Sequence, residues 1–200
     1  MRSREVIVPP LAEPLWRVFP WDRTASAGAP FSPEYVSLRQ GSGRFDLGGD
    51  PPVFYLAESP THAVGEKIQR YRGQRLRWHH LREFGRPLAL VSVTFAQENA
   101  PLIANLCDPA ELLRYQCRPD EFMSRDLSRT QGDSRRLHDH ELAGFRIWSS
   151  LSGDWHSTVL FVERFTGQFA LRFGTPSELD LHSPPVRDAA RELSISIAEG

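Results

Sequence analysis

The pattern of hydrophobic and polar residues is clearest between residues 53 and 71. Val53-Phe54-Tyr55-Leu56-Ala57 is typical of a buried strand, and Ser59-Pro60 after it supplies a capping hydroxyl and a proline for the first turn of a helix. The residues that then recur at helical spacing are Ala63, Val64, Ile68 and Tyr71. Glu66 lies off this apolar stripe. The pattern predicts a strand over 53–57 and a helix over 60–71.

The same reasoning predicts elements along the rest of the chain. The expected strands cover residues 15–19, 88–95, 102–106, 145–148, 158–165 and 169–173, and the expected helices cover 109–115, 128–142 and 186–193. Residues 20–52 hold many glycines and prolines and few apolar runs, which indicates a long loop. Since strands and helices do not alternate regularly, the sequence predicts an α+β domain over 15–175, with tails at 1–14 and 176–200.

Composition excludes several classes of protein. The chain has 200 residues, of which 40% are hydrophobic, so it can bury a core. Its formal net charge is −1, which gives no overall field for capturing nucleic acid or an anionic membrane. It has two cysteines and no apolar run of the ~18 residues that a membrane span needs. These features, with the absence of a signal-peptide pattern at the N-terminus, lead us to expect a cytoplasmic protein.

Two short motifs suggest ligands but do not meet the full pattern. Gly41-Ser42-Gly43-Arg44-Phe45-Asp46 begins like a dinucleotide fingerprint, but its sixth residue is aspartate. His138-Asp139-His140-Glu141 holds metal-ligating side chains, but neighbouring residues on a helix point in different directions. We therefore expect no metal and interpret these segments as a glycine-rich turn and a solvated helix face.

Residues 67–86 are rich in basic and aromatic side chains. The stretch holds seven lysines and arginines, with Tyr71 and Trp78 interleaved and Glu83 as its only acid. Such a pattern is typical of nucleic-acid-binding surfaces, and it supports an alternative in which the protein is a non-enzymatic binding module. Because the whole chain is near neutral, we expect no specific binding of nucleic acid by this stretch.

A scattered set of polar residues is chemically coherent. Arg17 and Arg44 could clamp a pyrophosphate through charge-assisted hydrogen bonds, and Tyr55 could stack on an aromatic ring. Glu66 could stabilise a developing cation, and a hydroxyl of Ser149 or its neighbour Ser150 could orient a sugar. Each also has an ordinary interpretation: the arginines as surface ion pairs, Tyr55 as a core residue, and Glu66 as a partner of Arg70 four residues later.

Five segments, in this order, resemble the RES domain, which is named for an arginine, a glutamate and a serine. They are Leu15-Trp16-Arg17-Val18, Gly41-Ser42-Gly43-Arg44-Phe45-Asp46, Tyr55-Leu56-Ala57-Glu58-Ser59-Pro60, Ala63-Val64-Gly65-Glu66, and Gly144-Phe145-Arg146-Ile147-Trp148-Ser149-Ser150 with Thr158-Val159-Leu160-Phe161 after it. The resemblance extends over residues 15–165. Many members have Gly-Arg-Trp-Asn where this chain has Gly43-Arg44-Phe45-Asp46, and the arginine-rich stretch after Tyr71 is a second departure.

The resemblance implies a fold and an activity. RES proteins are toxins of bacterial toxin–antitoxin pairs, their usual partner is an Xre-type helix-turn-helix antitoxin, and their compact fold with mixed or antiparallel sheets is similar to that of ADP-ribosyltransferase toxins. They consume NAD+. By resemblance, the site arginines are Arg17 and Arg44, the ring-stacking tyrosine is Tyr55, and the glutamate is Glu66. The serine is Ser149, with its neighbour Ser150 as the alternative.

The resemblance, together with the chemistry of these side chains, predicts an enzyme that cleaves the nicotinamide–ribose bond of NAD+. NAD+ is the substrate, and we expect no other cofactor. Cleavage produces an oxocarbenium-like centre that Glu66 would stabilise. We expect inorganic phosphate as the acceptor, which makes the protein an NAD+ phosphorylase. Transfer to a protein side chain and hydrolysis by water are the alternatives, and the oligomeric state stays open, a homo-oligomer included.

Overall fold

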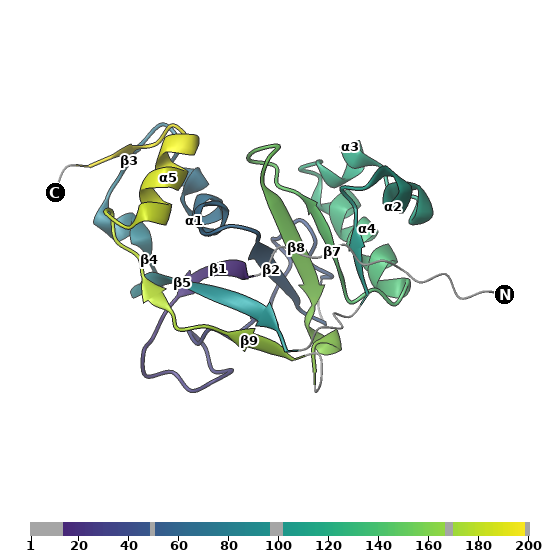
Figure 1. Cartoon of the computed structure of the whole chain (residues 1–200), viewed down its shortest axis with the longest axis horizontal. Helices are drawn as coiled ribbons and strands as arrows, with labels where there is room; N and C mark the ends of the chain where they lie inside the picture. Colours follow the sequence, from purple (N-terminus) through teal and green to yellow (C-terminus); the bar gives the residue numbers. More distant parts are fainter. Residues whose placement is uncertain (1–13, 49–50, 97–101, 167–169, 199–200) are drawn as a thin grey trace.

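A computed structural model describes residues 14–48, 51–96, 102–166 and 170–198 (Figure 1). Its main sheet runs in the order β10-β5-β1-β2-β8-β7-β6, with β4 and β9 also paired to β5. These strands are β1 (Leu15–Pro20), β2 (Val53–Ala57), β4 (Arg82–Glu83), β5 (Arg86–Phe95), β6 (Ile103–Asn105), β7 (Gly144–Trp148), β8 (His156–Phe161), β9 (Leu171–Phe173) and β10 (Ser177–Glu178). All pairs in the main sheet are antiparallel except β6 with β7.

Helices cover the sheet in two groups. Near one end, α1 (Pro60–Ile68) and α5 (Pro184–Glu192) lie beside β1 and β5, whereas α2 (Pro109–Arg114), α3 (Pro119–Phe122) and α4 (Leu127–Asp139) lie beside β7 at the other end (Figure 1). A separate pair of parallel strands joins β3 (Arg75–Leu76) to β11 (Ser196–Ile197). Short 3₁₀ turns, η1 (Gln69–Tyr71), η2 (Trp78–Leu81) and η3 (Val162–Arg164), complete the described elements.

Most elements predicted from the sequence are confirmed. The hydrophobic runs form β1, β2, β5, β6, β7, β8 and β9, and Ser59 caps α1 by accepting a hydrogen bond from the backbone N–H of His62. Three boundaries are wrong. The helix predicted over 128–142 ends at Asp139. The helix predicted to Tyr71 ends at Ile68 because the chain tightens into η1 and then turns at Gly73, whose φ is +79°. The strand predicted to residue 165 ends at Phe161, where η3 begins.

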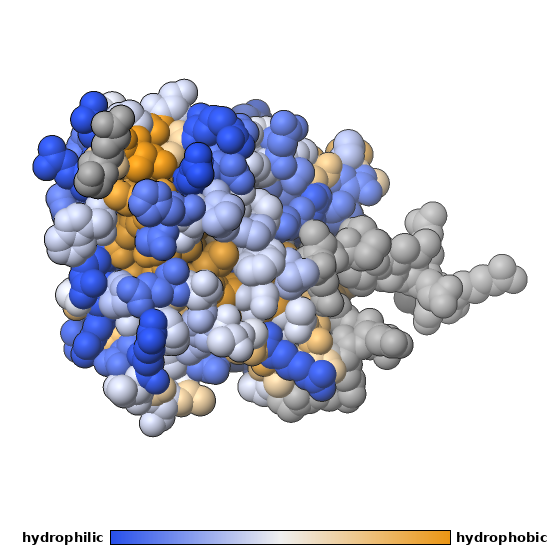
Figure 2. Space-filling model, turned by 60° about the vertical axis from the view of Figure 1, so that its left-hand side comes forward, coloured by the Kyte–Doolittle hydropathy of each residue, from blue (hydrophilic) through white to orange (hydrophobic). Residues whose placement is uncertain are grey.

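One hydrophobic cluster joins α1 to α5. Ile68 and Val64 of α1 pack with Val186 and Ala190 of α5, and all four are buried. The C-terminal segment, which was expected to be a tail with a short helix, thus contributes to the core. After α5, β11 pairs with β3. Figure 2 turns this side of the molecule forward and shows a band of hydrophobic residues among hydrophilic ones.

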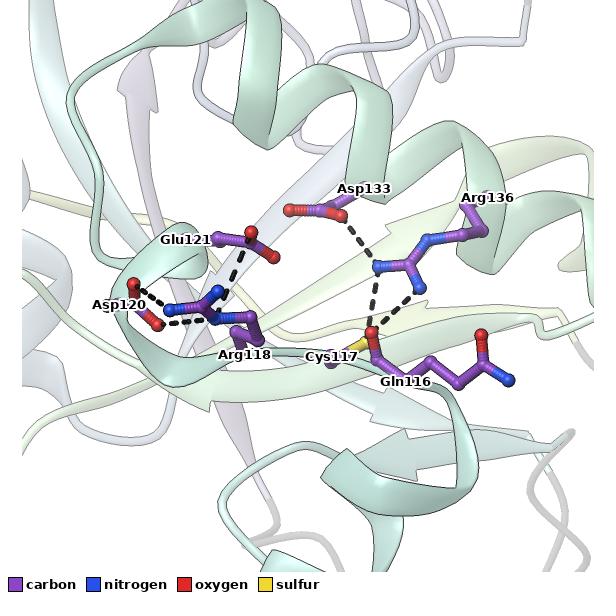
Figure 3. A network of polar contacts seen from close by, with 7 residues as sticks. All are labelled: Gln116, Cys117, Arg118, Asp120, Glu121, Asp133 and Arg136. Carbon is purple, nitrogen blue, oxygen red and sulfur yellow. Dashed lines mark hydrogen bonds and ion pairs between the residues drawn. The ribbon is translucent and has the colours of Figure 1, made fainter.

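A second cluster lies between β7, β8 and the helices α2–α4. Phe122 and Leu137 are buried against Phe145 of β7. Arg136 of α4 holds the α2–α3 connection against this cluster, because its guanidinium donates to the Tyr115 carbonyl at 3.0 Å. It also donates to the Gln116 carbonyl at 2.9 Å (Figure 3). This connection leads into α3, whose last residue is Phe122.

The third cluster lies on the opposite face of the sheet. It includes Leu15 and Phe19 of β1 and Phe54 of β2, whereas Trp16 and Ala57 pack in the α1–α5 cluster. Among the described residues, β1 and β2 pair only at Trp16 and Ala57, although β1 pairs with β5 over its whole length. A cleft lies where these two central strands part. No helix of the described residues is long and apolar enough to span a membrane.

Candidate active site

The cleft has a volume of about 840 Å³ and is lined by both central strands. Residues from β1, the long loop, β2 and α1 meet in it, and the β4–β5 hairpin and the residues after β7 contribute at its edges. The candidate residues in its lining are Arg17, Arg44, Tyr55, Glu66 and Ser150. Segments that are far apart in the sequence therefore contribute to one cavity.

Glu66 lies on α1 at this cleft and accepts hydrogen bonds from three side chains. Its Oε1 lies 2.9 Å from the Ser149 Oγ, which donates, and 3.0 Å from the His62 Nε2. The side chain is 40% exposed, so one part of the carboxylate is held by the protein while the group still faces the cleft. Gln69 donates from its Nε2 to the other oxygen at 3.1 Å.

These contacts keep Glu66 ionised. Burial acts to raise the pKa of its carboxyl group, but the hydrogen bonds from His62 and Ser149 and the nearby charge of Arg44 outweigh burial and lower the pKa below its ordinary value. At neutral pH Glu66 is a carboxylate with fixed orientation. Such a group can stabilise a positive charge that develops beside it.

The sequence interpretation gave His62 no role, and its spacing of four residues from Glu66 was the available signal. His62 is 1% exposed and its ring stacks on Trp155 with centroids 5.1 Å apart. Trp155 approaches the helix at Gly65, where an added Cβ would lie 2.6 Å from the indole ring. Since an ionised carboxylate only accepts hydrogen bonds, Nε2 of His62 is the nitrogen that donates its N–H to Glu66. The other ring nitrogen, Nδ1, has no hydrogen-bond partner among the described residues.

The two neighbouring serines differ in environment. Ser149 is 1% exposed, follows β7 and has its backbone N–H bonded to the Trp155 carbonyl at 2.7 Å. Its hydroxyl touches Glu66, whereas Ser150 is exposed and lines the cleft. Ser149 is therefore placed to hold the carboxylate, and Ser150 is placed to meet a ligand.

Tyr55 and the glycine-rich turn form one hydrogen-bonded unit. The Tyr55 hydroxyl donates to Oδ1 of Asp46 at 2.7 Å and accepts from the Phe45 N–H at 3.0 Å. Asp46 also accepts from the N–H groups of Gly41 and Gly43, each at 2.7 Å. Burial and the Asp46 carboxylate raise the pKa of Tyr55, so its hydroxyl stays protonated and its ring, 36% exposed, faces the cleft.

Asp46 is the second residue of the site that the sequence interpretation missed. The sequence interpretation treated it only as a departure from the dinucleotide fingerprint and from the family pattern. It is 3% exposed, and it fixes the turn on which Arg44 is carried. Gly43 is required there, because a Cβ would lie 2.5 Å from Oδ1 of Asp46 and 2.6 Å from the Tyr55 hydroxyl. Gln131 of α4 holds the turn from outside by donating to the carbonyls of Gly41 and Gly43.

Arg44 lies between the turn and α3. Its guanidinium donates to the Phe122 carbonyl at 3.0 Å and lies 4.9 Å from the centre of the Phe45 ring. Burial lowers the pKa of Arg44, and the negative charge of Glu66 opposes this effect. Arg44 is therefore a cation close to the proposed reacting carboxylate.

Arg17 is placed differently. Its guanidinium donates to the Pro33 carbonyl at 2.6 Å and the Tyr35 carbonyl at 2.8 Å, and it lies 4.4 Å from the centre of the Phe54 ring. Burial lowers the pKa of Arg17 to about 10, and Glu34 partly offsets this effect. In this structure Arg17 fastens the long loop to β1 at the cleft wall.

The structure thus brings Glu66, Ser149 and Arg44 together, with Tyr55 beside Arg44. The ordinary interpretation of Glu66 as a partner of Arg70 is wrong, because the ion pair of Arg70 is with Glu83 at 3.8 Å. Among the described residues, no group of histidine, cysteine, aspartate and glutamate side chains is arranged to hold a metal ion.

The chain is similar to known proteins in family pattern and in fold. The chain matches the family model described as RES domain over residues 14–181. No curated protein matches it. A chain of the M. tuberculosis MbcT–MbcA toxin–antitoxin complex is similar in structure, with a TM-score of 0.60 and 18% sequence identity over 90% of this chain and 88% of that chain. At this identity the likeness is one of fold, and it confirms the predicted α+β class.

Proposed function

The chain belongs to the RES-domain family, and from this premise we propose that it is a toxin of a bacterial toxin–antitoxin pair that consumes NAD+. The observation that carries the proposal is Glu66, an ionised carboxylate at a cleft, held by Ser149 and His62 and close to Arg44. The similarity to a toxin–antitoxin complex supports it.

Breaking the bond between nicotinamide and ribose leaves positive charge on C1′ and its ring oxygen, while the bonding electrons leave with nicotinamide. The Glu66 carboxylate stabilises this charge in the transition state. Ser149 and His62 keep the carboxylate in one orientation, so little reorganisation is needed when the charge develops. An acceptor oxygen then forms a new bond to C1′.

The other residues hold the substrate. Arg44 binds the pyrophosphate through charge-assisted hydrogen bonds, and Tyr55 packs its exposed ring face against nicotinamide. Ser150 lines the cleft and hydrogen-bonds the ribose. Arg17 either joins Arg44 on the pyrophosphate after leaving its loop carbonyls or supports the cleft from its present place.

We favour inorganic phosphate as the acceptor, because cations at the cleft attract an anion. Reaction with phosphate gives nicotinamide and ADP-ribosyl phosphate, whereas water gives ADP-ribose and a protein acceptor becomes modified. Mass spectrometry of the products, with and without phosphate, separates the three outcomes. Turnover that is unaffected by phosphate and yields free ADP-ribose would replace the phosphorylase assignment by a glycohydrolase.

The proposed function is tested with Glu66→Gln, which keeps the side-chain size and removes the charge. We expect nicotinamide release to fall by about 10²-fold or more, with the fold retained by circular dichroism. Near-wild-type release by folded Glu66→Gln would contradict the mechanism. The control is Glu192→Gln, a change of the same type on the exposed side of α5, which should leave the rate unchanged.

We further propose a helix-turn-helix antitoxin of the Xre type as the protein partner. Expression of the wild type in a bacterial host should then arrest growth and lower cellular NAD+, and co-expression of the adjacent antitoxin gene should restore growth. Glu66→Gln should be harmless. Strong expression of folded wild-type protein with unchanged NAD+ would count against the toxin assignment.

A further inference from the structure

Two phenylalanines line the edge of the cleft in unusual backbone conformations. Phe31 has φ +70° and Phe84 has φ +52°, both in the left-handed region that side chains other than glycine rarely adopt. Their ring centroids are 6.4 Å apart, and both residues belong to the cleft lining. Two segments more than fifty residues apart therefore place a pair of aromatic rings at one site.

Phe84 is unfavourable for stability in two ways. With Gly85, whose φ is +74°, it forms the two-residue turn between β4 and β5, where asparagine or glycine is usual. Its side chain is also 78% exposed. A large apolar residue that is both strained and exposed at a cleft indicates a ligand contact.

The aromatic pair is held in a fixed place relative to Glu66. Lys67, next to Glu66 on α1, forms an ion pair of 2.8 Å with Glu83, next to Phe84 on the hairpin. On the other side, Arg86 pairs with Asp22 at 3.0 Å, and its guanidinium lies 5.7 Å from the Phe31 ring centre. The hairpin thus has a defined position beside the proposed reaction centre, with the cleft joining the two.

We propose that Phe31 and Phe84 form the subsite for the adenine of NAD+. This inference rests on the proposed function, because it places the far end of that same substrate. Adenine is a flat, weakly polar ring, and stacking on exposed aromatic side chains is a common way for proteins to bind such a base. The nicotinamide end reaches Glu66 while the adenine end rests on the phenylalanine pair, so the cleft selects a dinucleotide.

The test compares steady-state nicotinamide release by wild type, Phe84→Ala and Phe84→Trp. Adenine stacking stabilises the bound substrate and the transition state equally, so we expect Phe84→Ala to raise KM for NAD+ by about tenfold or more with kcat little changed. Phe84→Trp keeps an aromatic face and should stay within about threefold of wild type. Phe31→Ala should raise KM in the same way.

Trp78→Ala is the matched control, because Trp78 is 67% exposed and does not line the cleft. Its KM should equal that of the wild type. An unchanged KM for Phe84→Ala in an active enzyme would overturn the subsite and leave the proposed function standing. Loss of antitoxin binding with unchanged KM would overturn it in favour of a protein contact. Absence of nicotinamide release by the wild type would overturn both proposals.

Discussion

At Glu66, burial and hydrogen bonding act on one carboxyl group in opposite directions. The hydrogen-bond donors prevail, and the pKa of Glu66 is lowered. The folded chain therefore stabilises the ionised carboxylate relative to its protonated form. A group whose pKa is lowered on folding contributes stability above its unfolded pKa, and that stability is lost as the pH falls through the folded value. The residue that would perform the chemistry thus also stabilises the fold at neutral pH.

This linkage predicts a pH-dependent effect of Glu66→Gln. We expect wild type to exceed the variant in free energy of unfolding at pH 7, and the difference to shrink as the pH falls below 4.5, the ordinary value for glutamate. Protonated glutamate and glutamine have similar shape and hydrogen-bonding groups. Urea unfolding of wild type and variant at several pH values measures the difference in their free energies of unfolding. All other titrating groups are common to both proteins, so their contributions cancel in this difference. A difference that grows toward acid would contradict the pKa direction.

His62 is expected to act by positioning Glu66. His62→Ala should lower kcat by about tenfold or more, because Glu66 loses one of the donors that fix its orientation. His62→Gln can still donate toward the carboxylate and should recover part of the rate. A purely structural role would instead lower the thermal midpoint of both variants alike and leave kcat per folded molecule unchanged.

The charge of Arg44 and the shape of its guanidinium can be separated by Arg44→Lys. Lysine keeps the charge but cannot bind the Phe122 carbonyl and a phosphate with one planar group, so we expect kcat/KM for NAD+ to fall by about 10- to 100-fold. Arg39→Lys, in the same loop but exposed and outside the cleft lining, is the control and should have no effect. Equal rates for wild type and Arg44→Lys would mean that charge alone suffices.

At the scale of elements, an ion pair connects β7 to the end of β2 across β8. Arg146 of β7 bonds to both carboxylate oxygens of Glu58, and both side chains are largely buried, with 20% and 15% exposure. Burial and the Glu58 bond act oppositely on Arg146, and the bond to Glu58 prevails and raises the pKa of Arg146. The pair therefore holds together the strands that carry Tyr55 and lead to Ser149.

We expect Arg146→Ala to lower the free energy of unfolding by about 3 kcal/mol, because the largely buried Glu58 carboxylate loses its guanidinium partner. Arg118→Ala breaks an exposed pair with Asp120, visible in Figure 3, and should change stability by less than about 1 kcal/mol. Urea unfolding of the two variants makes the comparison. Equal effects would show that burial of the Glu58 pair has no energetic consequence.

Prediction from sequence succeeded where a local pattern sufficed. The apolar runs of β2 and β5 and the cap at Ser59 are local signals, and each predicted its element. Two-residue strands such as β3 and β11 have no periodicity to detect, since they form when distant segments meet. The contact of Ser149 with Glu66 likewise joins residues 83 positions apart. Family resemblance rather than spacing assigned the two residues to one site.

At the scale of the whole molecule, the most consequential difference from expectation is the C-terminal segment. It was expected to be a tail with a short helix over 186–193, and the family match ends at residue 181. Yet Val186 of α5 is fully buried against the cluster that contains Val64 and Ile68 of α1. Since α1 carries both His62 and Glu66, packing by α5 supports the helix on which the proposed chemistry depends.

Placing a charge at Val186 tests this support. Val186→Asp buries a carboxylate with no partner, and we expect it to lower the free energy of unfolding by about 4 kcal/mol or more and to reduce nicotinamide release in parallel. Arg187→Asp introduces the same side chain at the adjacent exposed position of α5 and should change little. Thermal unfolding and activity are measured on both. If Val186→Asp unfolds at the wild-type temperature and stays active, α5 is dispensable to the core, and the helix that carries Glu66 is held by the sheet alone.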